Sequence, residues 1–265
     1  MIPRGALILA FAAACALPRL AGAQQQKIEF APSAEAPIKK IAIVRIEGTR
    51  RLSITNESTA GVVLGFGLIP ALVEAAEVDK KTKEYLAEMR QRKISFAPAL
   101  HAALQKELGK SYELIYLPNQ RPRLLEDKKT VDYSSIQTDA DAILHVYYGH
   151  VGYLSPPFRN SYAPWVEIGV KLIDARTRTT LYYKNISVFQ SGKDAGRLIR
   201  RSNPLLESMR PDPQFAYGSF EDLMGKFEDS IQGILRSQEM IVARIAQNLT
   251  GTRSAPEPEE DVTPP

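Results

Sequence analysis

Three glycines in a stretch without charged side chains are the first residues whose spacing suggests chemistry. Residues 60–73 carry no charge and include Gly61, Gly65 and Gly67. A dinucleotide-binding loop needs Gly-x-Gly-x-x-Gly directly between a strand and a helix, because backbone N–H groups must face the phosphates. Pro70 occupies the position of the third glycine, and about ten polar residues separate the stretch from the preceding predicted strand. We therefore predict that this segment binds no nucleotide.

A second phosphate-loop candidate is the Gly-Lys-Ser sequence at 109–111. The motif would require glycine at position 104, where Leu104 stands, and it must come before a helix. Leucines at 100, 104 and 108 instead predict a helix that begins at an N-cap, Ser95, and ends at Gly109. We expect Gly109 to cap this helix.

The three histidines, His101, His145 and His150, are candidates for metal or acid–base chemistry. His145 and His150 are five residues apart on one predicted strand, so they point to opposite faces and cannot share a metal ion without a bulge. No Gly-x-Ser-x-Gly motif of a serine hydrolase occurs. We predict no metal, no cofactor and no catalytic residue. The alternative is a periplasmic small-ligand binder or hydrolase that uses His145 or His150 with nearby tyrosines.

Aromatic residues cluster between Tyr147 and Tyr183. Tyrosine is common on half-exposed strands, whereas aromatic residues on an exposed surface are enriched in protein interfaces. The cluster can therefore be part of the sheet packing or a recognition surface. For the second case we predict that Phe158, Tyr162 and Trp165 contact a partner or a membrane.

The uncharged stretch supplies a second candidate contact. Its fourteen uncharged residues are too few to span a bilayer, while its glycine spacing allows another helix to approach closely. We expect a tight turn followed by a helix from Leu68. Two alternatives remain for Val62, Leu64, Phe66 and Leu68: packing within their own domain, or contact with a partner or membrane. In the second case the chain would be a peripheral membrane protein that inserts residues 60–73.

The N-terminus has the features of a secretory signal. Arg4 precedes an apolar run at 5–17, and small residues at 21–23 permit cleavage before Gln24. Removal of this segment takes away Arg4 and Arg19 and lowers the formal net charge from +4 to +2. A charge this small gives no support for binding to nucleic acid.

Cys15, the only cysteine, leaves two outcomes for the N-terminus. Either it is removed with the signal peptide at 1–23, or it is acylated and kept as a membrane anchor. In both cases the exported domain contains no disulfide, so its hydrophobic core must stabilise it.

The rest of the chain predicts one α/β domain at 38–250, between a linker at 24–37 and a disordered acidic, proline-rich tail at 251–265. Hydrophobic patterns predict a mixed sheet with an antiparallel hairpin, covered by helices, and a long C-terminal amphipathic helix. Ser219 and Asp222 have the spacing of a capping box at the start of that helix. The predicted strands lie at 38–48, 112–118, 141–154, 166–174 and 181–190, and the helices at 95–109 and 220–249.

Three segments resemble the CsgG-like group of bacterial envelope proteins. They are KKIAIVRIEG at 39–48, the strand that begins with Asp141 and Ala142, and VKLIDARTRTTLYY at 170–183. The group includes the curli-secretion lipoprotein and LpoB-like lipoproteins, with a TolB N-terminal-like α/β fold. The resemblance spans most of residues 38–249 as a pattern and brings no shared catalytic residues. The membrane-hairpin pattern of the curli pore is missing, so we predict no secretion channel.

These features together predict a non-enzymatic exported protein that acts in binding or assembly in the periplasm, in association with the outer membrane. The expected partners are envelope proteins or further copies of the chain, with contact to a membrane surface as an additional interaction. We expect no nucleic acid and no nucleotide as ligands.

Overall fold

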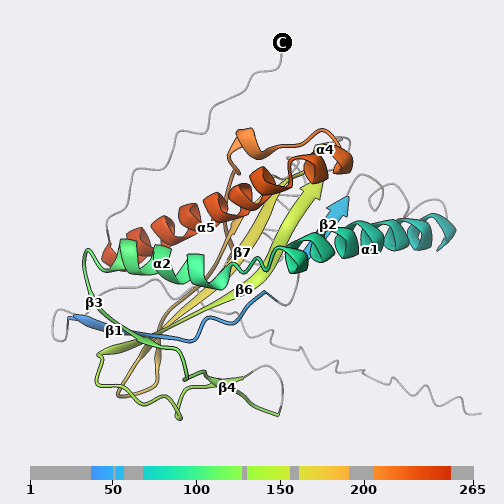
Figure 1. Ribbon diagram of the computed structural model, residues 1–265. Coiled ribbons are helices and arrows are strands. Elements are labelled where there is room, and N and C mark those ends of the chain that lie inside the picture. Colours follow the sequence, from blue (N-terminus) through green and yellow to red (C-terminus); the bar gives the residue numbers. More distant parts are fainter. Residues whose placement is uncertain are drawn as a thin grey trace, which may run out of the picture.

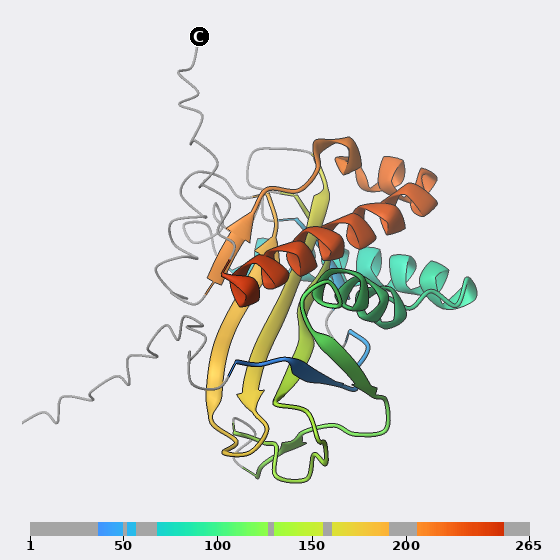
Figure 2. The same ribbon diagram turned by 90° about the vertical axis from the view of Figure 1, so that its left-hand side faces the viewer.

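The computed structural model describes residues 37–49, 52–56, 68–126, 130–155, 161–190 and 206–251. Within these ranges the chain forms a seven-stranded mixed sheet with helices on one face and a small two-stranded ribbon at one end (Figures 1 and 2). This architecture confirms the predicted fold class. The predicted signal segment, most of the linker and nearly all of the acidic tail lie outside the described residues.

The long strand β6 organises the sheet, whose order is β3-β1-β6-β7-β8-β9 with β2 also paired to β6. β1 and β2 both run parallel to β6, whereas β7 is antiparallel to it on the other side. β1 is also paired with β3 and four of its five residues are buried, as its β-branched sequence predicts. The strands are β1 (Lys40–Val44), β2 (Leu52–Asn56), β3 (Glu113–Leu117), β6 (Ala142–Ser155), β7 (Ala163–Asp174), β8 (Thr180–Val188) and β9 (Leu206–Met209).

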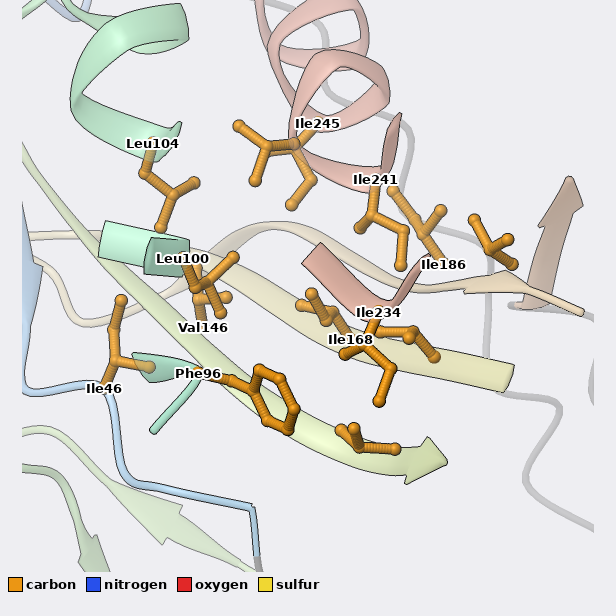
Figure 3. Close-up of a cluster of buried hydrophobic side chains, with 14 of the residues drawn as sticks. Ile46, Phe96, Leu100, Leu104, Val146, Ile168, Ile186, Ile234, Ile241 and Ile245 are labelled. Carbon is orange, nitrogen blue, oxygen red and sulfur yellow. The ribbon is translucent and has the colours of Figure 1, made fainter. Parts of the chain in front are cut away.

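Four helices belong to the described residues: α1 (Leu68–Gln91), α2 (Ala97–Leu108), α4 (Phe220–Gly225) and α5 (Phe227–Thr250). Isoleucines of α5 and leucines of α2 point at β6, β7 and β8 (Figure 3). Their spacing of three and four residues places them on one side of each helix, which is why the helices lie flat on the sheet. Fully buried members include Leu100, Leu104, Ile234, Ile241 and Ile245.

A buried serine joins two helices to the sheet. The Tyr85 hydroxyl on α1 lies 2.8 Å from Ser230 Oγ on α5, and the Tyr153 hydroxyl of β6 donates to the Ser230 carbonyl at 2.7 Å. Ser230 Oγ itself donates to the carbonyl of Phe227, so the Tyr85 hydroxyl is the donor to Ser230. Because buried polar groups are costly without partners, these bonds fix how α1 and α5 sit over β6.

A β-bulge changes the alternation of β6. Tyr148 pairs with Ile168 of β7, but the next pair is Val151 with Val166, so β6 carries one extra residue between them. As a result Val146 before the bulge and Val151 after it both face the helices. Gly152 follows with φ +152°, and a Cβ at this position would lie 1.9 Å from the carbonyl oxygen of Ser53 in β2.

The opposite face of the sheet is covered at one end by residues from 118–126 and 130–140. These residues include β4 (Arg123–Leu124) and β5 (Val131–Asp132), which pair as an antiparallel hairpin. Tyr133 and Ile136 pack there on Val44, Ile143 and Ile173 and form a second, smaller core.

Several local predictions are wrong. The predicted C-terminal helix is interrupted at Lys226, which ends α4 and begins α5 with φ −114° and ψ 42°. Phe96, not Ser95, is the N-cap of α2, and Pro98 near the helix start sets the backbone there. The Ser219 cap is confirmed, because its hydroxyl accepts from the Asp222 backbone N–H. The predicted strands also do not include β2, β9 or the β4–β5 hairpin, which the structure contains.

Tertiary ion pairs hold β9, the last strand of the sheet. Glu207 accepts from Lys184 of β8 at 2.7 Å and from Arg244 of α5 at 2.6 Å, while Asn248 donates to it at 3.2 Å. The pKa of Glu207 is lowered because these partners outweigh its burial, which acts in the opposite direction. These contacts attach β9 to β8 and α5. The four residues of β9 are too few to predict a strand from their sequence alone.

We expect Gly152→Ala to destabilise the fold by about 3 kcal/mol or more, because an added Cβ collides with the β2 backbone and the φ angle disfavours alanine. Urea unfolding monitored by circular dichroism measures the effect. Gly218→Ala is the matched control, since nothing lies within 4 Å of its added Cβ, and it should change stability by less than about 0.5 kcal/mol. Equal stability of both variants would contradict the role assigned to Gly152.

Candidate functional site

On the second face of the sheet, the described residues contribute polar and aromatic side chains and no helix. All helical residues of the described core belong to the cluster on the other face. We call this second surface the helix-free face. Its central residues are neither fully buried nor fully exposed. They are His145, Tyr147, His150, Trp165, Glu167, Lys171 and Tyr183.

Strand alternation explains how these side chains come together. In β7, residues Val166, Ile168 and Val170 enter the main core, so Trp165, Glu167 and Lys171 point the other way. Lys171 is paired with His145 of β6 and Tyr183 of β8, so these three side chains form one row across three strands.

Ring contacts connect His145 of this row to Tyr133 and to Tyr147 of the same strand. The hydroxyl of Tyr133 lies 2.9 Å from His145 Nδ1, and the ring centroids of His145 and Tyr147 are 5.1 Å apart. Lys171 Nζ lies 4.7 Å from the centroid of the Tyr183 ring. Burial is the main cause of a raised pKa for Tyr147, so its hydroxyl stays protonated and can donate.

Two glycines let the side chains of this face lie close to the sheet. A Cβ on Gly169 would be 2.3 Å from the ring of Tyr147, so that ring lies directly over the glycine. A Cβ on Gly149 would similarly be 2.9 Å from Glu167 Oε1. The positions of Tyr147 and Glu167 therefore depend on residues without side chains.

His145 is uncharged at neutral pH. Burial lowers its pKa to about 4, the charge of Lys171 acts in the same direction, and Glu47 opposes both. An imidazole with such a pKa is a weak base near pH 7, whereas acid–base catalysis works best with a pKa near the working pH. The geometry of His145 thus suits a structural hydrogen bond with Tyr133.

The other histidine of the face stacks on the only tryptophan in the chain. The ring centroids of His150 and Trp165 are 3.6 Å apart with an interplanar angle of 22°, and His150 Nε2 lies 3.4 Å from Ser53 Oγ. The prediction that His145 and His150 point to opposite faces is wrong, because the bulge in β6 turns His150 to the side of Trp165. The glycines at 149 and 152 were the sequence signal for this bulge.

The predicted contact residues differ in where the structure places them. Trp165 lies on the helix-free face, six residues before Lys171 along β7. Tyr162 has only 4% of its surface exposed, with its hydroxyl accepting from Lys81 and its ring against Phe220, so its position does not support a role in surface contact.

The remaining sites stay predictions because they are not described. Val62, Leu64, Phe66, Phe158 and Cys15 lie outside the described residues. The backbone of Leu68 begins α1, as expected, while its side chain lies outside the description.

Sequence reasoning did not select Tyr133, Glu167 or Lys171. Glu167 and Lys171 could have been found from the alternation in β7, but the approach of Tyr133 depends on the fold of residues 118–140. His101 is not part of the helix-free face. It lies on α2 and packs on Tyr116 of β3, with the two ring centroids 3.8 Å apart.

Among the described residues, no group of three or more His, Cys, Asp or Glu side chains is arranged to hold a metal ion. None of the helices described is both long and apolar enough to cross a membrane.

We expect the stability of the protein to fall as the pH drops from about 6.5 to about 4, by up to about 3 kcal/mol from His145 alone. The unfolded chain takes up a proton on this histidine below its ordinary pKa, whereas the folded chain does so only near pH 4. Urea unfolding at pH 7 and pH 4.5 should show a smaller loss for His145→Gln than for the wild type. Titration of the His145 ring signals near pH 6.5 by NMR would contradict this expectation.

No protein-family model and no curated protein matches the chain. Among solved structures, a Xanthomonas campestris protein of the DUF330 family has 9% identity and a TM-score of 0.37, with 85% of this chain and 94% of that chain covered. A hypothetical protein from Chlamydia trachomatis has 12% identity and a TM-score of 0.32, with 81% and 99% covered. A lipoprotein from Neisseria meningitidis has 15% identity and a TM-score of 0.20, with 62% and 94% covered.

These three structures are of bacterial proteins, and one of them is a lipoprotein. Likeness at these TM-scores carries no argument about the function of this chain. None of the three is described as CsgG-like, so that resemblance stays a prediction.

Proposed function

We propose that this protein is a non-enzymatic binding or assembly protein of the bacterial cell envelope and that its helix-free face binds a protein partner. The observation that carries the proposal is that the row of His145, Lys171 and Tyr183 and the Trp165–His150 stack lie on the same face of the sheet. Large rings with polar atoms, arranged on a rigid sheet, are typical of the residues that dominate protein interfaces.

The rigidity of the face supports this role. Tyr147 rests on Gly169, and Trp165 stacks on His150, so both rings hold their positions before a partner arrives. Side chains that are already ordered lose little conformational entropy on binding. A partner that covers these rings would gain buried apolar area at a low entropic cost.

The location in the envelope is supported by the N-terminal signal features, with Cys15 either removed or acylated. The resemblance of the strand patterns to CsgG-like proteins points the same way. Envelope proteins are therefore the expected partners, and a second copy of this chain is the alternative.

An enzymatic role for His145 is less well supported. Its Nδ1 is engaged with Tyr133, and its pKa of about 4 makes it a weak base at neutral pH. A binding role requires neither a proton acceptor nor a cofactor, so the observed arrangement of side chains is sufficient for it.

Site-specific photo-crosslinking tests the proposal. A photo-reactive amino acid at Tyr183 should crosslink to a discrete envelope protein, or to a second copy, in intact cells of the source bacterium. The matched control is the same amino acid at Arg236 on the exposed side of α5, which should give no such product. Trp165→Ala in the Tyr183-labelled chain should reduce the crosslinked product at least tenfold. The same product from Arg236, or no product from Tyr183, would contradict the proposal.

A further inference from the structure

The strand β3 lies at one edge of the sheet, where β1 is its one strand neighbour among the described residues. The Glu113 N–H donates to the Lys39 carbonyl at 2.8 Å, so the backbone of Glu113 faces β1. In a parallel pair the N–H and C=O of one residue face the same neighbour, and those of the next residue face the other side. The backbone groups of Leu114 and Tyr116 therefore point away from the sheet.

The part of this edge that can pair is limited at both ends. The Tyr112 N–H already donates to the Leu108 carbonyl at 2.9 Å, and Pro118 has no N–H. A further strand can thus form regular hydrogen-bonded pairs only with Leu114 and Tyr116. Outward N–H and C=O groups in this arrangement are complementary to another extended chain.

The side chains of β3 do not protect this edge in the way that those of β9 protect the other. β9 has only four residues, and its Glu207 is engaged over the sheet by Lys184 and Arg244. Short strands and inward-pointing charges are devices that keep edge strands from pairing with other chains. β3 instead carries one charged residue, at its first position, followed by four apolar residues at 114–117.

A second copy of β3, placed antiparallel, fits this edge in one register. When Leu114 lies opposite Tyr116 of the second copy, the two outward-facing residues of each copy exchange both N–H and C=O hydrogen bonds. A shift by two residues in one direction places Tyr112 opposite Tyr116, and a shift in the other places Pro118 opposite Leu114. Both shifts lose hydrogen bonds, so the residues that limit the edge also set the register.

The side chains of β3 match in the same register. The two-fold axis passes between the two copies of Ile115, whose Cα atoms lie about 4.5 Å apart in such a non-hydrogen-bonded pair. Ile115 is half-buried and belongs to neither of the two core clusters of the described residues, so the pairing covers apolar surface that the fold leaves open. Glu113 lies opposite Leu117 of the second copy, which keeps the two Glu113 carboxylates about 13 Å apart along the strands.

We propose that two copies of this chain pair through β3 in this antiparallel register and form one continuous sheet. Five-residue strands bury less area than a standard interface, so the association is reversible and depends on concentration. The two-fold axis of such a pair is perpendicular to the sheet, so both helix-free faces lie on the same side of the dimer. Binding of a partner by both faces at once, which rests on the proposed function, is then strengthened by avidity.

Disulfide formation in the envelope of the source bacterium tests the pairing in the full chain. We expect Ile115→Cys to give a disulfide-linked dimer on non-reducing gels, because a Cα separation of about 4.5 Å lies within the range that a disulfide spans. Glu113→Cys is the matched control, since it lies on the same face of β3 but about 13 Å from its counterpart, and it should give at least tenfold less dimer. The wild type controls for Cys15. Equal amounts of dimer from both variants, or none from Ile115→Cys, would overturn the inference.

Sedimentation velocity of the chain purified from the envelope measures the same pairing without a crosslink. The wild type should shift from monomer to dimer as its concentration rises. Ile115→Lys should raise the dissociation constant at least tenfold, because two ammonium groups meet at the two-fold axis, whereas Ile115→Val keeps the branched side chain and should retain the dimer. Circular dichroism shows whether both variants are folded.

Three results would contradict the pairing through β3. They are a monomer at every concentration, an unchanged dimer of folded Ile115→Lys, and a disulfide of Ile115→Cys to a different protein, which would show that the edge accepts a strand other than its own. The crosslink at Tyr183 reports on the helix-free face of β8. Its absence therefore counts against the proposed function and leaves the sedimentation result for β3 unchanged, so the two failures can be told apart.

Discussion

The extra residue in β6 is the constraint on which the rest of the structure depends. β6 is paired with β1, β2 and β7, so its register fixes the position of all three strands. Without the bulge, strict alternation would turn Val151 and Tyr153 away from the helices. With it, both residues enter the core and the Tyr153 hydroxyl reaches Ser230 of α5. The bulge therefore sets the helix packing and, by turning His150 toward Trp165, part of the candidate surface as well.

The sequence allowed the regular parts of the fold to be predicted because their periodicity is strong. The alternating residues of β7 and the spaced isoleucines of α5 are buried as expected. β2 and β9 were missed because four or five residues with only two apolar side chains form too weak a pattern. Their positions come from distant contacts instead, such as the approach of Ser53 to Gly152 and the ion pairs of Glu207 with Lys184 and Arg244.

The candidate surface was only partly predictable for the same reason. Trp165 could be selected because it is the only tryptophan of the chain and tryptophan is enriched in protein interfaces. Tyr162, only three residues earlier, has the same apparent character but is buried, since its backbone pairs with Tyr217 and its ring meets Phe220. Residue type alone could not separate the two. Tyr133 approaches His145 only because the segment after β5 folds back onto the sheet.

The two faces of the sheet differ in how they can be covered. Helices cover one face because its side chains are apolar, whereas on the other face Val44, Ile143 and Ile173 form a small apolar cluster with Tyr133 and Ile136. Beyond them come His145 and Lys171, and burying an amine under an apolar helix would carry a large desolvation cost. A partner must therefore leave Lys171 and Glu167 solvated or supply opposite charges while it covers Trp165 and Tyr183. This requirement favours a wet, partly polar interface of the kind found in reversible complexes.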